Sequence, residues 1–327
     1  MVFIPKLTRA KRFKRNGRTI FAGIAVNDRD DKQRKACESP DASGMECCIA
    51  GGSLMEGFPL FLNMSSYTES IIRIRFQFVF FADYNTVMKV GILHKWDVSP
   101  AEAVAIQKEL VCKATEEKPA WRLPQTLAAA DVSCERFSKH MCAAVVVVSY
   151  PEMEIIETAT AALDTGFPYV PGLLSFREAP AALMAFEKLA SKPDAVMIDG
   201  HGKAHPRGFG LACHIGLSLD LPTFGVAKSP LAGEYSNVGN ERGDMSDIIY
   251  KGKPAGAALR TKRDVKPVFV SVGHRIDIET AIRITLECAR GTRLPYPARL
   301  AHAAANDLRK ETTAAIAKIT TDGNTPS

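Results

Sequence analysis

Three acidic residues stand where the local sequence pattern does not favour a charge. Asp131 lies inside an apolar strand-like run, Asp199 directly follows a second such run, and Glu178 lies in the first turn of the helix expected between them. A buried carboxylate is costly unless it is paired, hydrogen-bonded or bound to a metal. Oxygen ligands with open positions suit Mg²⁺, with Mn²⁺ as its substitute. The sequence therefore predicts that Asp131 and Asp199 hold a divalent cation.

Each carboxylate also has a structural alternative to weigh. Glu178 follows Ser175 by three residues, a spacing that would complete a capping box at a helix start. Asp199 could simply begin the tight turn "DGHG". Asp131 has the weakest alternative, because aspartate is poorly suited to a strand interior. The three together, on these elements and in this order, favour a functional site.

Metal-assisted hydrolysis of a phosphodiester is the chemistry that these residues predict. A divalent cation lowers the pKa of water and neutralises charge on a leaving oxygen. Lys228, at the end of an apolar strand, could stabilise charge on the phosphate, although an ordinary surface lysine is the alternative. His274, at another strand end, is a candidate for a phosphate or water contact.

Two further histidines, His201 and His205, imitate a zinc site with Asp199. Glycines and a proline break the helix that would place both rings on one face, so the sequence argues against zinc. His205 is predicted to form a wall or donate a hydrogen bond near the site, with a structural role as the alternative.

The elements that must position these residues follow a regular order. A helix is expected in 97–114, capped by Ser99 with Pro100 in its first turn. Three β-rich runs then predict an antiparallel meander. Alternating helices and strands after it predict right-handed parallel crossovers. The later elements are a hairpin turning at 253–256, a strand, and two helices; the fold class is a mixed α/β sheet flanked by helices.

The chain is expected to divide into three parts. Residues 1–90 lack a steady period and are predicted to be a poorly patterned extension; 91–305 form the catalytic domain, and 306–327 contain a helix end and a polar tail. The extension begins with a basic run, for which a targeting or nucleic-acid arm is one interpretation and a solvated segment another.

Bulk composition favours a soluble intracellular protein. Of the 327 residues 46% are hydrophobic and 24% charged, and the formal net charge of +6 suits a phosphate-bearing partner. The eight cysteines contain no C-x-x-C pair and predict reduced thiols. No apolar run approaches the ~18 residues needed to cross a bilayer. We expect a cytoplasmic monomer without membrane contact.

Five segments together resemble the endonuclease V family of DNA repair nucleases. In chain order they are "ADVS", "PYVPGLLSFRE", "DGHGKAHPR", "GVAKSPL" and "GHRI". The resemblance covers about 95–300 and implies an RNase H-like fold. It also implies Mg²⁺-dependent nicking of DNA that contains deoxyinosine, at the second phosphodiester 3′ to the lesion, leaving a 3′-OH and a 5′-phosphate.

The resemblance assigns roles motif by motif. Asp131 and Asp199 resemble the metal ligands of the family, and Glu178, Lys228 and His274 its other cleavage-site residues. Tyr169, between two prolines, resembles a wedge that contacts DNA where the altered base leaves the stack. The pocket for the flipped base is implied at Gly172, Leu174, Gly200, His205 and Gly225.

Two other functions remain open at this stage. The same chemistry could act on inosine-containing RNA, since contacts to a ribose 2′-OH cannot be located from the sequence. A non-catalytic nucleic-acid-binding module would need the basic surface but not three carboxylates.

Overall fold

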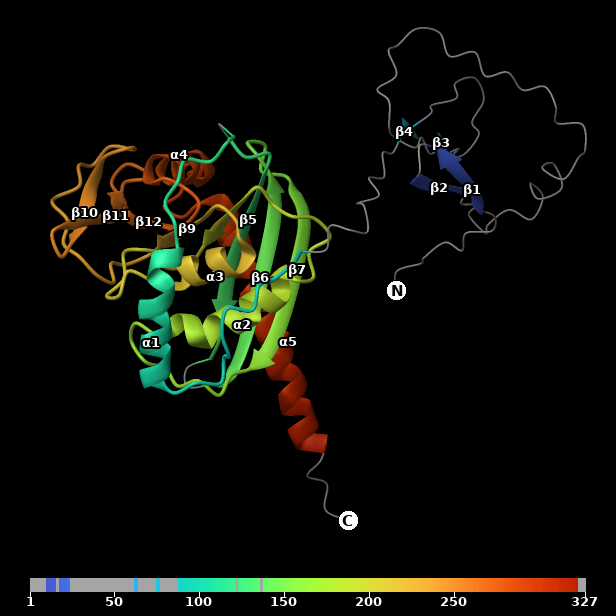
Figure 1. The fold of residues 1–327 in the computed structure, drawn as a ribbon, viewed down its shortest axis with the longest axis horizontal. Helices are drawn as coiled ribbons and strands as arrows, with labels where there is room; N and C mark the ends of the chain where they lie inside the picture. Colours follow the sequence, from blue (N-terminus) through green and yellow to red (C-terminus); the bar gives the residue numbers. More distant parts are fainter. Residues whose placement is uncertain are drawn as a thin grey trace, which may run out of the picture. The chain divides into compact units, whose positions relative to one another are not determined.

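A computed structural model describes residues 88–121, 123–135 and 138–322, with only the backbone in 317–322 and in four short strands nearer the N-terminus. The chain divides into two compact units, Met1–Phe81 and Ala82–Ser327 (Figure 1). In the first, β1 (Ala10–Arg15) pairs with β2 (Arg18–Gly23), and β3 (Leu62–Asn63) pairs with β4 (Arg75–Phe76), both antiparallel. The rest of the predicted 1–90 extension, up to residue 87, lies outside the described residues.

The second unit is built on an eight-stranded sheet with the order β10-β11-β12-β9-β8-β5-β6-β7. Its strands are β5 (Thr126–Ser133), β6 (His140–Ser149), β7 (Ile155–Asp164), β8 (Ala195–Ile198), β9 (Thr223–Ala227), β10 (Met245–Tyr250), β11 (Lys253–Leu259) and β12 (Val268–His274). The predicted meander is confirmed, because β6 is antiparallel to both β5 and β7. The parallel additions are confirmed too, since β5, β8 and β9 run in the same direction.

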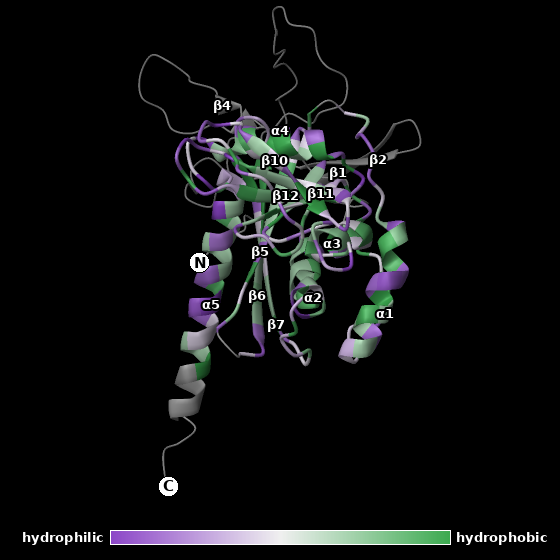
Figure 2. Cartoon of the chain, turned by 90° about the vertical axis from the view of Figure 1, so that its left-hand side faces the viewer, coloured by the Kyte–Doolittle hydropathy of each residue, from purple (hydrophilic) through white to green (hydrophobic). Residues whose placement is uncertain are grey.

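Helices cover both faces of this sheet (Figures 1 and 2). One apolar core joins α2 (Leu174–Phe186) and α3 (Leu211–Leu219) to one face, and the other core joins α4 (Ile278–Ala289) and α5 (Tyr296–Asp322) to the opposite face. Alternate residues of β5 and β6 serve the two cores, as the period of two in a strand requires. The central strands are therefore buried on both sides, which explains their continuous apolar runs.

One more helix, α1 (Pro100–Leu110), continues into a 3₁₀ turn at Val111–Lys113. Its predicted cap is confirmed: Ser99 accepts from the amide of Glu102, and the Glu102 side chain accepts from the amide of Ser99. α1 packs through apolar side chains against the segment that leads into α2 and against Phe209. The helix thus lies against two loops that matter for the site.

Two local predictions are wrong. Helix α2 begins at Leu174 after Leu173 as N-cap, with no side-chain cap, so Ser175 lies inside the helix and does not form a capping box with Glu178. The β10–β11 hairpin turns at Lys251 and Gly252, both with positive φ, rather than at 253–256. A left-handed pair of residues suits a two-residue hairpin, and this turn sets the register.

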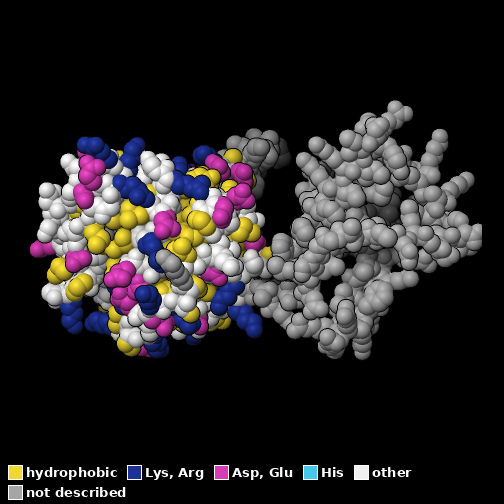
Figure 3. All heavy atoms as spheres, turned by 90° about the horizontal axis from the view of Figure 1, so that it is seen from above, with side chains coloured by type: hydrophobic (Ala, Val, Ile, Leu, Met, Phe, Trp, Pro, Cys, Tyr) yellow, Lys and Arg dark blue, Asp and Glu magenta, His cyan; other side chains and the backbone are white. Residues whose placement is uncertain are grey.

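The surface of the second unit carries side chains of both charges. On the face drawn in Figure 3, lysine and arginine side chains are dispersed among acidic and apolar ones. The five cysteines in the part of the chain that the structure describes are free thiols. Within that same part, none of the helices combines the length and apolar character that crossing a membrane would require.

The expected domain limits differ slightly from the observed packing. Met88 is buried in the core beneath α2, and Val90 packs beside it, so the catalytic unit includes residues before 91. Helix α5 runs without a break through 305, so no structural boundary falls there.

Candidate active site

Two carboxylates meet at the end of the central parallel strands. Ala130 of β5 is paired with Ile198 of β8, and the amide of Asp199 donates to the carbonyl of Ala130 at 3.0 Å. The next residues on the two chains are therefore Asp131 and Asp199. A right-handed crossover through α2 brings them together from positions far apart in the sequence.

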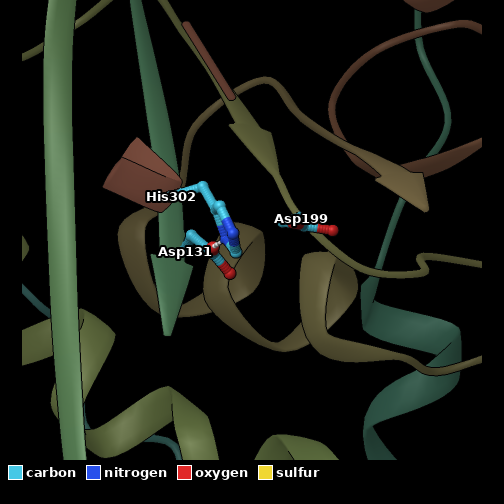
Figure 4. Close-up of side chains that lie close together, drawn as sticks. All are labelled: Asp131, Asp199 and His302. Atoms are coloured by element: carbon cyan, nitrogen blue, oxygen red, sulfur yellow. Dashed lines mark hydrogen bonds and ion pairs between the residues drawn. The ribbon is translucent and has the colours of Figure 1, made fainter. Parts of the chain in front are cut away.

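A histidine completes this group. His302 lies on α5, and its Nδ1 is 2.6 Å from Oδ2 of Asp131. Ligand atoms of Asp131, Asp199 and His302 all lie within 4.8 Å of one another. Figure 4 shows Asp131 and His302 pointing toward one another, with Asp199 beside them. We call these three residues the Asp131 cluster.

The electrostatics of the Asp131 cluster favour a cation. Burial raises the pKa of the Asp131 carboxyl, and the charge of Asp199 raises it further, while His302 and Lys228 act in the opposite direction. Lys228 follows β9 directly and donates to Oδ2 of Asp199 at 2.5 Å. Two adjacent carboxylates are thus held in a poorly solvated place by two basic side chains that remain partly exposed.

Glu178 is a third acidic group coupled to the same place. It lies in α2 and is partly buried. Its pKa is raised to about 8, first by burial and then by the charges of Asp131 and Asp199, with Arg177 opposing. Like charges that share a site cannot all ionise without cost, so in the metal-free chain Glu178 holds a proton at neutral pH. Together with the missing capping box, this favours the functional interpretation over the helix cap.

His302 is held by a directional chain of hydrogen bonds. Arg309 Nε donates to the hydroxyl of Ser133, and that hydroxyl donates to Oδ1 of Asn306. The amide nitrogen of Asn306 then faces Nε2 of His302 at 3.0 Å. Because Oδ1 of Asn306 already accepts from Ser133, the NH₂ group of Asn306 is the one that donates to Nε2 of His302. The His302 ring therefore carries its proton on Nδ1, toward Asp131.

Tyr169 lies on the loop before α2 and is 71% exposed. The neighbouring Phe167 is buried and stacks on Phe176, with ring centroids 5.5 Å apart. Arg177 donates to the carbonyl of Phe167 at 2.8 Å, which fixes the base of the loop. Phe167, rather than Tyr169, therefore packs the loop onto the core, and the tyrosine ring lies at the surface.

Of the five residues implied for a base pocket, Gly172, Leu174 and His205 lie together. His205 Nε2 donates to the carbonyl of Gly172 at 2.9 Å, and Leu174, two residues later, is 38% exposed. Burial lowers the pKa of His205 to about 4, so its ring is neutral. His205 thus donates to the protein's own backbone, which is the structural role that the sequence offered as the alternative.

Gly200 and Gly225 face each other rather than open space. A Cβ on Gly225 would lie 2.3 Å from the carbonyl oxygen of Gly200, so β9 needs a glycine where the turn after Asp199 crosses it. Gly200 itself is partly exposed. The close approach of two backbone segments explains Gly225 without any ligand, and only Gly200 of this pair could border a pocket.

His274 is not brought to the Asp131 cluster, and its sequence-based placement needs correction. It is paired with Thr223 at the start of β9, whereas Lys228 follows the end of that strand. The five residues between them span about 16 Å at the rise of a strand. Because β12 is antiparallel to β9, the last residue of β12 lies beside the first residue of β9, at the opposite end of that strand from Lys228. There His274 is buried, accepts from the amide of Thr115, and has its pKa lowered by burial.

His201 is bonded to the backbone rather than to the cluster, since its Nε2 is 2.9 Å from the carbonyl of Ser229. The zinc site that the sequence argued against is therefore not assembled by His201 and His205. The residue that sequence reasoning missed is His302. Its signal was a polar stripe on α5, in which His302, Asn306 and Arg309 follow one another at spacings of four and three beside the buried alanines of the same helix.

Comparisons with known proteins agree with this fold. The sequence model of the endonuclease V family matches residues 106–303. Endonuclease V of Dehalococcoides mccartyi is 46% identical over 221 residues, which cover 68% of this chain and 99% of that protein. Endonuclease V of Methanothrix thermoacetophila is 46% identical over 215 residues, covering 66% of this chain and 94% of that one.

Solved structures give the same result. The crystal structure of endonuclease V from Streptomyces avermitilis has a TM-score of 0.64 and 39% identity, covering 69% of this chain and 99% of its own. The Ciona intestinalis endonuclease V, solved with a 24mer DNA containing an inosine followed by a ribo-adenosine, has a TM-score of 0.56 and 28% identity, covering 65% of this chain and 98% of its own. The fold is RNase H-like, as expected. The chain therefore belongs to the endonuclease V family and is an endonuclease.

Proposed function

We propose that this protein is a metal-dependent endonuclease that nicks DNA containing deoxyinosine. It cuts the second phosphodiester 3′ to the lesion and leaves a 3′-OH and a 5′-phosphate. The observation that carries the proposal is the pairing of Asp131 with Asp199 at the ends of adjacent parallel strands, beside a lysine and a histidine. The relative solved with inosine-containing DNA supports the choice of substrate.

The residues of the Asp131 cluster fit a divalent cation. The two carboxylates supply the oxygen ligands that a divalent cation takes, His302 is hydrogen-bonded to one of them, and burial leaves Asp131 in need of a positive partner. We assign Mg²⁺ as the cation, with Mn²⁺ as its substitute. When bound, it would activate water and neutralise charge on the phosphate.

The chain's own residues have separate tasks in this scheme. Lys228 is 41% exposed and can turn from Asp199 to a phosphate oxygen, where its charge would stabilise the transition state. Glu178 is coupled to the charges of Asp131 and Asp199 and, in its protonated form, can give a proton to the leaving oxygen. His302, oriented by Asn306, keeps Asp131 in place.

Recognition is assigned to the loop before α2. Extruding a base costs a few kcal/mol, which a rigid aromatic side chain can offset by replacing lost stacking. Tyr169 is exposed, is flanked by Pro168 and Val170 in the stiff "PYVP" segment, and lies nine residues before Glu178. A short piece of chain thus carries both the wedge and an acidic group of the site.

The decisive experiment is a nicking assay on matched duplexes with and without one deoxyinosine. We expect a single cut in the lesion strand that requires Mg²⁺ or Mn²⁺ and disappears with EDTA. A cut that does not depend on inosine, or its complete absence with either metal, would show that the proposal is wrong. Mapping the product on a sequencing gel tests the position of the cut.

Inosine-containing RNA is the second candidate substrate. It is favoured by one observation, namely that the Ciona relative was solved on a strand whose inosine is followed by a ribonucleotide. Parallel assays on all-DNA, all-RNA and single-ribonucleotide strands of the same sequence separate the two. A rate on RNA at least as high as on DNA would make the ribonuclease the better description.

A further inference from the structure

Gln107 is a polar side chain at a place where packing alone would favour an apolar one. It lies near the end of α1, is fully buried, and the helix residues around it pack against two apolar clusters. Every polar atom of its amide is used. Nε2 donates to the carbonyls of Gly172, at 3.1 Å, and Phe209, at 3.0 Å, and Oε1 accepts from Arg207 Nε.

The carbonyl of Gly172 is the centre of this group. Besides Gln107, it accepts from His205 Nε2 and from Arg207 Nη2. Gly172 has φ +77°, and a Cβ there would lie 2.6 Å from Arg207 Nη2, so only glycine admits this approach. We call Gln107, Gly172, His205, Arg207 and the carbonyl of Phe209 the Gly172 network.

His205 has no ring nitrogen left for another partner. Its Nδ1 accepts from the amide of Arg207 at 3.2 Å, while Nε2 donates to Gly172. Burial and the neighbouring Arg207 charge keep the ring neutral, with a pKa of about 4. The ring is therefore part of the frame of the proposed pocket, and recognition of a base edge through His205 would first require one of these bonds to break.

The network joins three segments that are separate in the chain. Gly172 lies at the end of the loop that carries Tyr169. His205 and Arg207 lie in the turn that follows Asp199, and Gln107 belongs to α1. Apolar contacts alone are tolerant of small shifts, whereas a fully satisfied buried polar network specifies one arrangement. Direct bonds from His205 and Arg207 join the wedge loop to the turn after Asp199, and the Gln107 amide bonds to both segments and to Arg207, which fixes their spacing against α1.

We propose that Gln107 is a positioning residue for lesion recognition. It contacts neither the Asp131 cluster nor solvent, and acts by holding the loop of Tyr169 against the turn at 203–209 so that the pocket is formed before DNA arrives. The proposal rests on the proposed function, because it assigns base recognition to these two segments. It predicts that discrimination between damaged and undamaged DNA depends on Gln107.

The test uses Q107M in the full-length protein, with I106V as the matched control. Methionine keeps the length and apolar bulk of the side chain but removes all three hydrogen bonds. Ile106 packs against the same two clusters, so its truncation perturbs α1 without touching the network. The measurements are affinity for inosine and undamaged duplexes in Ca²⁺, single-turnover rates at saturating enzyme in Mg²⁺, Mn²⁺ affinity without DNA, and hydrogen exchange of the free protein.

For Q107M we expect the ratio of the two duplex affinities to fall roughly tenfold or more, since small misplacements of a binding group have effects of that size. The saturated cleavage rate should fall less, and Mn²⁺ affinity should stay unchanged. The amides of Leu173 and Gly208, which donate to Val170 and His205, should exchange faster than in I106V. If I106V and Q107M lose the same discrimination, or Q107M loses none, the positioning role is overturned.

Two provisions keep the result interpretable. Should Q107M fail to fold, Q107E takes its place, because it retains the acceptor for Arg207 while losing both donations to carbonyls, and the same shift is expected. Failure of the wild type to nick the inosine duplex would refute the proposed function and, with it, lesion recognition. Unchanged exchange at Leu173 and Gly208 would refute the positioning role alone.

Discussion

The Asp131 cluster and the Gly172 network each combine a polar side chain of a helix with groups on loops or strands, but their hydrogen bonds are arranged differently. In the cluster, two carboxylates are matched by Lys228 and His302, which are about half exposed, and the lysine can exchange its partner. In the network, Gln107 and His205 are buried, neutral and bonded to backbone groups. One region can admit a new ligand, and the other keeps its geometry.

This difference separates cleavage from recognition within one unit. Carboxyl groups with a raised pKa, such as Asp131 and Glu178, are typical of sites that change state during a reaction. A buried network whose polar atoms are all hydrogen-bonded instead contributes rigidity. Variants in the two regions should therefore fail in different assays, and the predictions below test that separation from the largest expected effect to the smallest.

The largest effect is expected for D131N and D199N. Removing either carboxylate should lower cleavage of the inosine duplex roughly 10³-fold, since stabilisation by a metal amounts to several kcal/mol and each 1.36 kcal/mol is a factor of ten. Lesion affinity should stay within about threefold in a binding assay without catalytic metal, because the Gly172 network is untouched. D131N should also melt no lower than the wild type, because the raised pKa of Asp131 means that its charge destabilises the fold.

The matched control is D247N, an exposed aspartate on β10. It should cleave at the wild-type rate. Equal losses of cleavage and lesion affinity in D131N would contradict the separation of the two regions.

The second effect concerns the support of His302. N306A removes the amide that faces its Nε2, so the ring is no longer fixed toward Asp131. Losing such a partner of a metal-site histidine typically reduces metal affinity about 10- to 100-fold. Titration calorimetry with Mn²⁺ measures this directly, with D307A, an exposed neighbour on α5, as the control. Wild-type affinity in N306A would indicate that His302 is not needed to bind the cation.

The third effect is expected for Y169A. Base stacking on an aromatic side chain is worth about 1–3 kcal/mol, so affinity for the inosine duplex should fall about tenfold. The melting temperature should be unchanged, because the side chain is 71% exposed. I156A, an exposed apolar residue on the edge strand β7, controls for loss of surface area. An unchanged affinity in Y169A would refute the wedge.

The sequence was sufficient for the part of the site that follows from strand order. Asp131 lies inside one apolar run and Asp199 follows another, and the parallel pairing of β5 with β8 makes those runs neighbours. The same local reasoning failed for His274, since only the direction of β12 relative to β9 decides at which end of β9 the last residue of β12 lies. Pairing direction is a tertiary property, and a strand pattern does not contain it.

Contacts between elements that are distant in the sequence could not be predicted from it for another reason. His302 is 171 residues from Asp131, on a long alanine-rich helix whose polar stripe could equally have faced solvent. The burial of Gln107 depends on how α1 lies over two loops, and nothing in its own helix indicates those carbonyl partners. Spacing also misled at Ser175 and Glu178, because the positive φ of Gly172 lets the helix begin before the serine.

The smallest effect is a pH dependence of stability that separates Glu178 from an ordinary helix glutamate. Its pKa is about 8 in the folded, metal-free chain against an ordinary value of 4.5. Between these values the folded state binds the proton more tightly than the unfolded state, so the free energy of unfolding falls as pH rises from about 4.5 to 8 and then levels off.

E178Q removes this pH dependence of stability. In EDTA, the melting temperatures of E178Q and wild type should nearly coincide at pH 5. At pH 8 the variant should melt about 2–4 °C higher, the shift for about 1 kcal/mol in a domain of this size. The expected shift in melting temperature is modest because Glu178 is partly exposed and solvent screens its charge. E187Q, exposed at the end of the same helix, should follow the wild type at every pH. If E178Q and wild type keep a constant difference from pH 5 to 8, Glu178 does not share the charge of the Asp131 cluster.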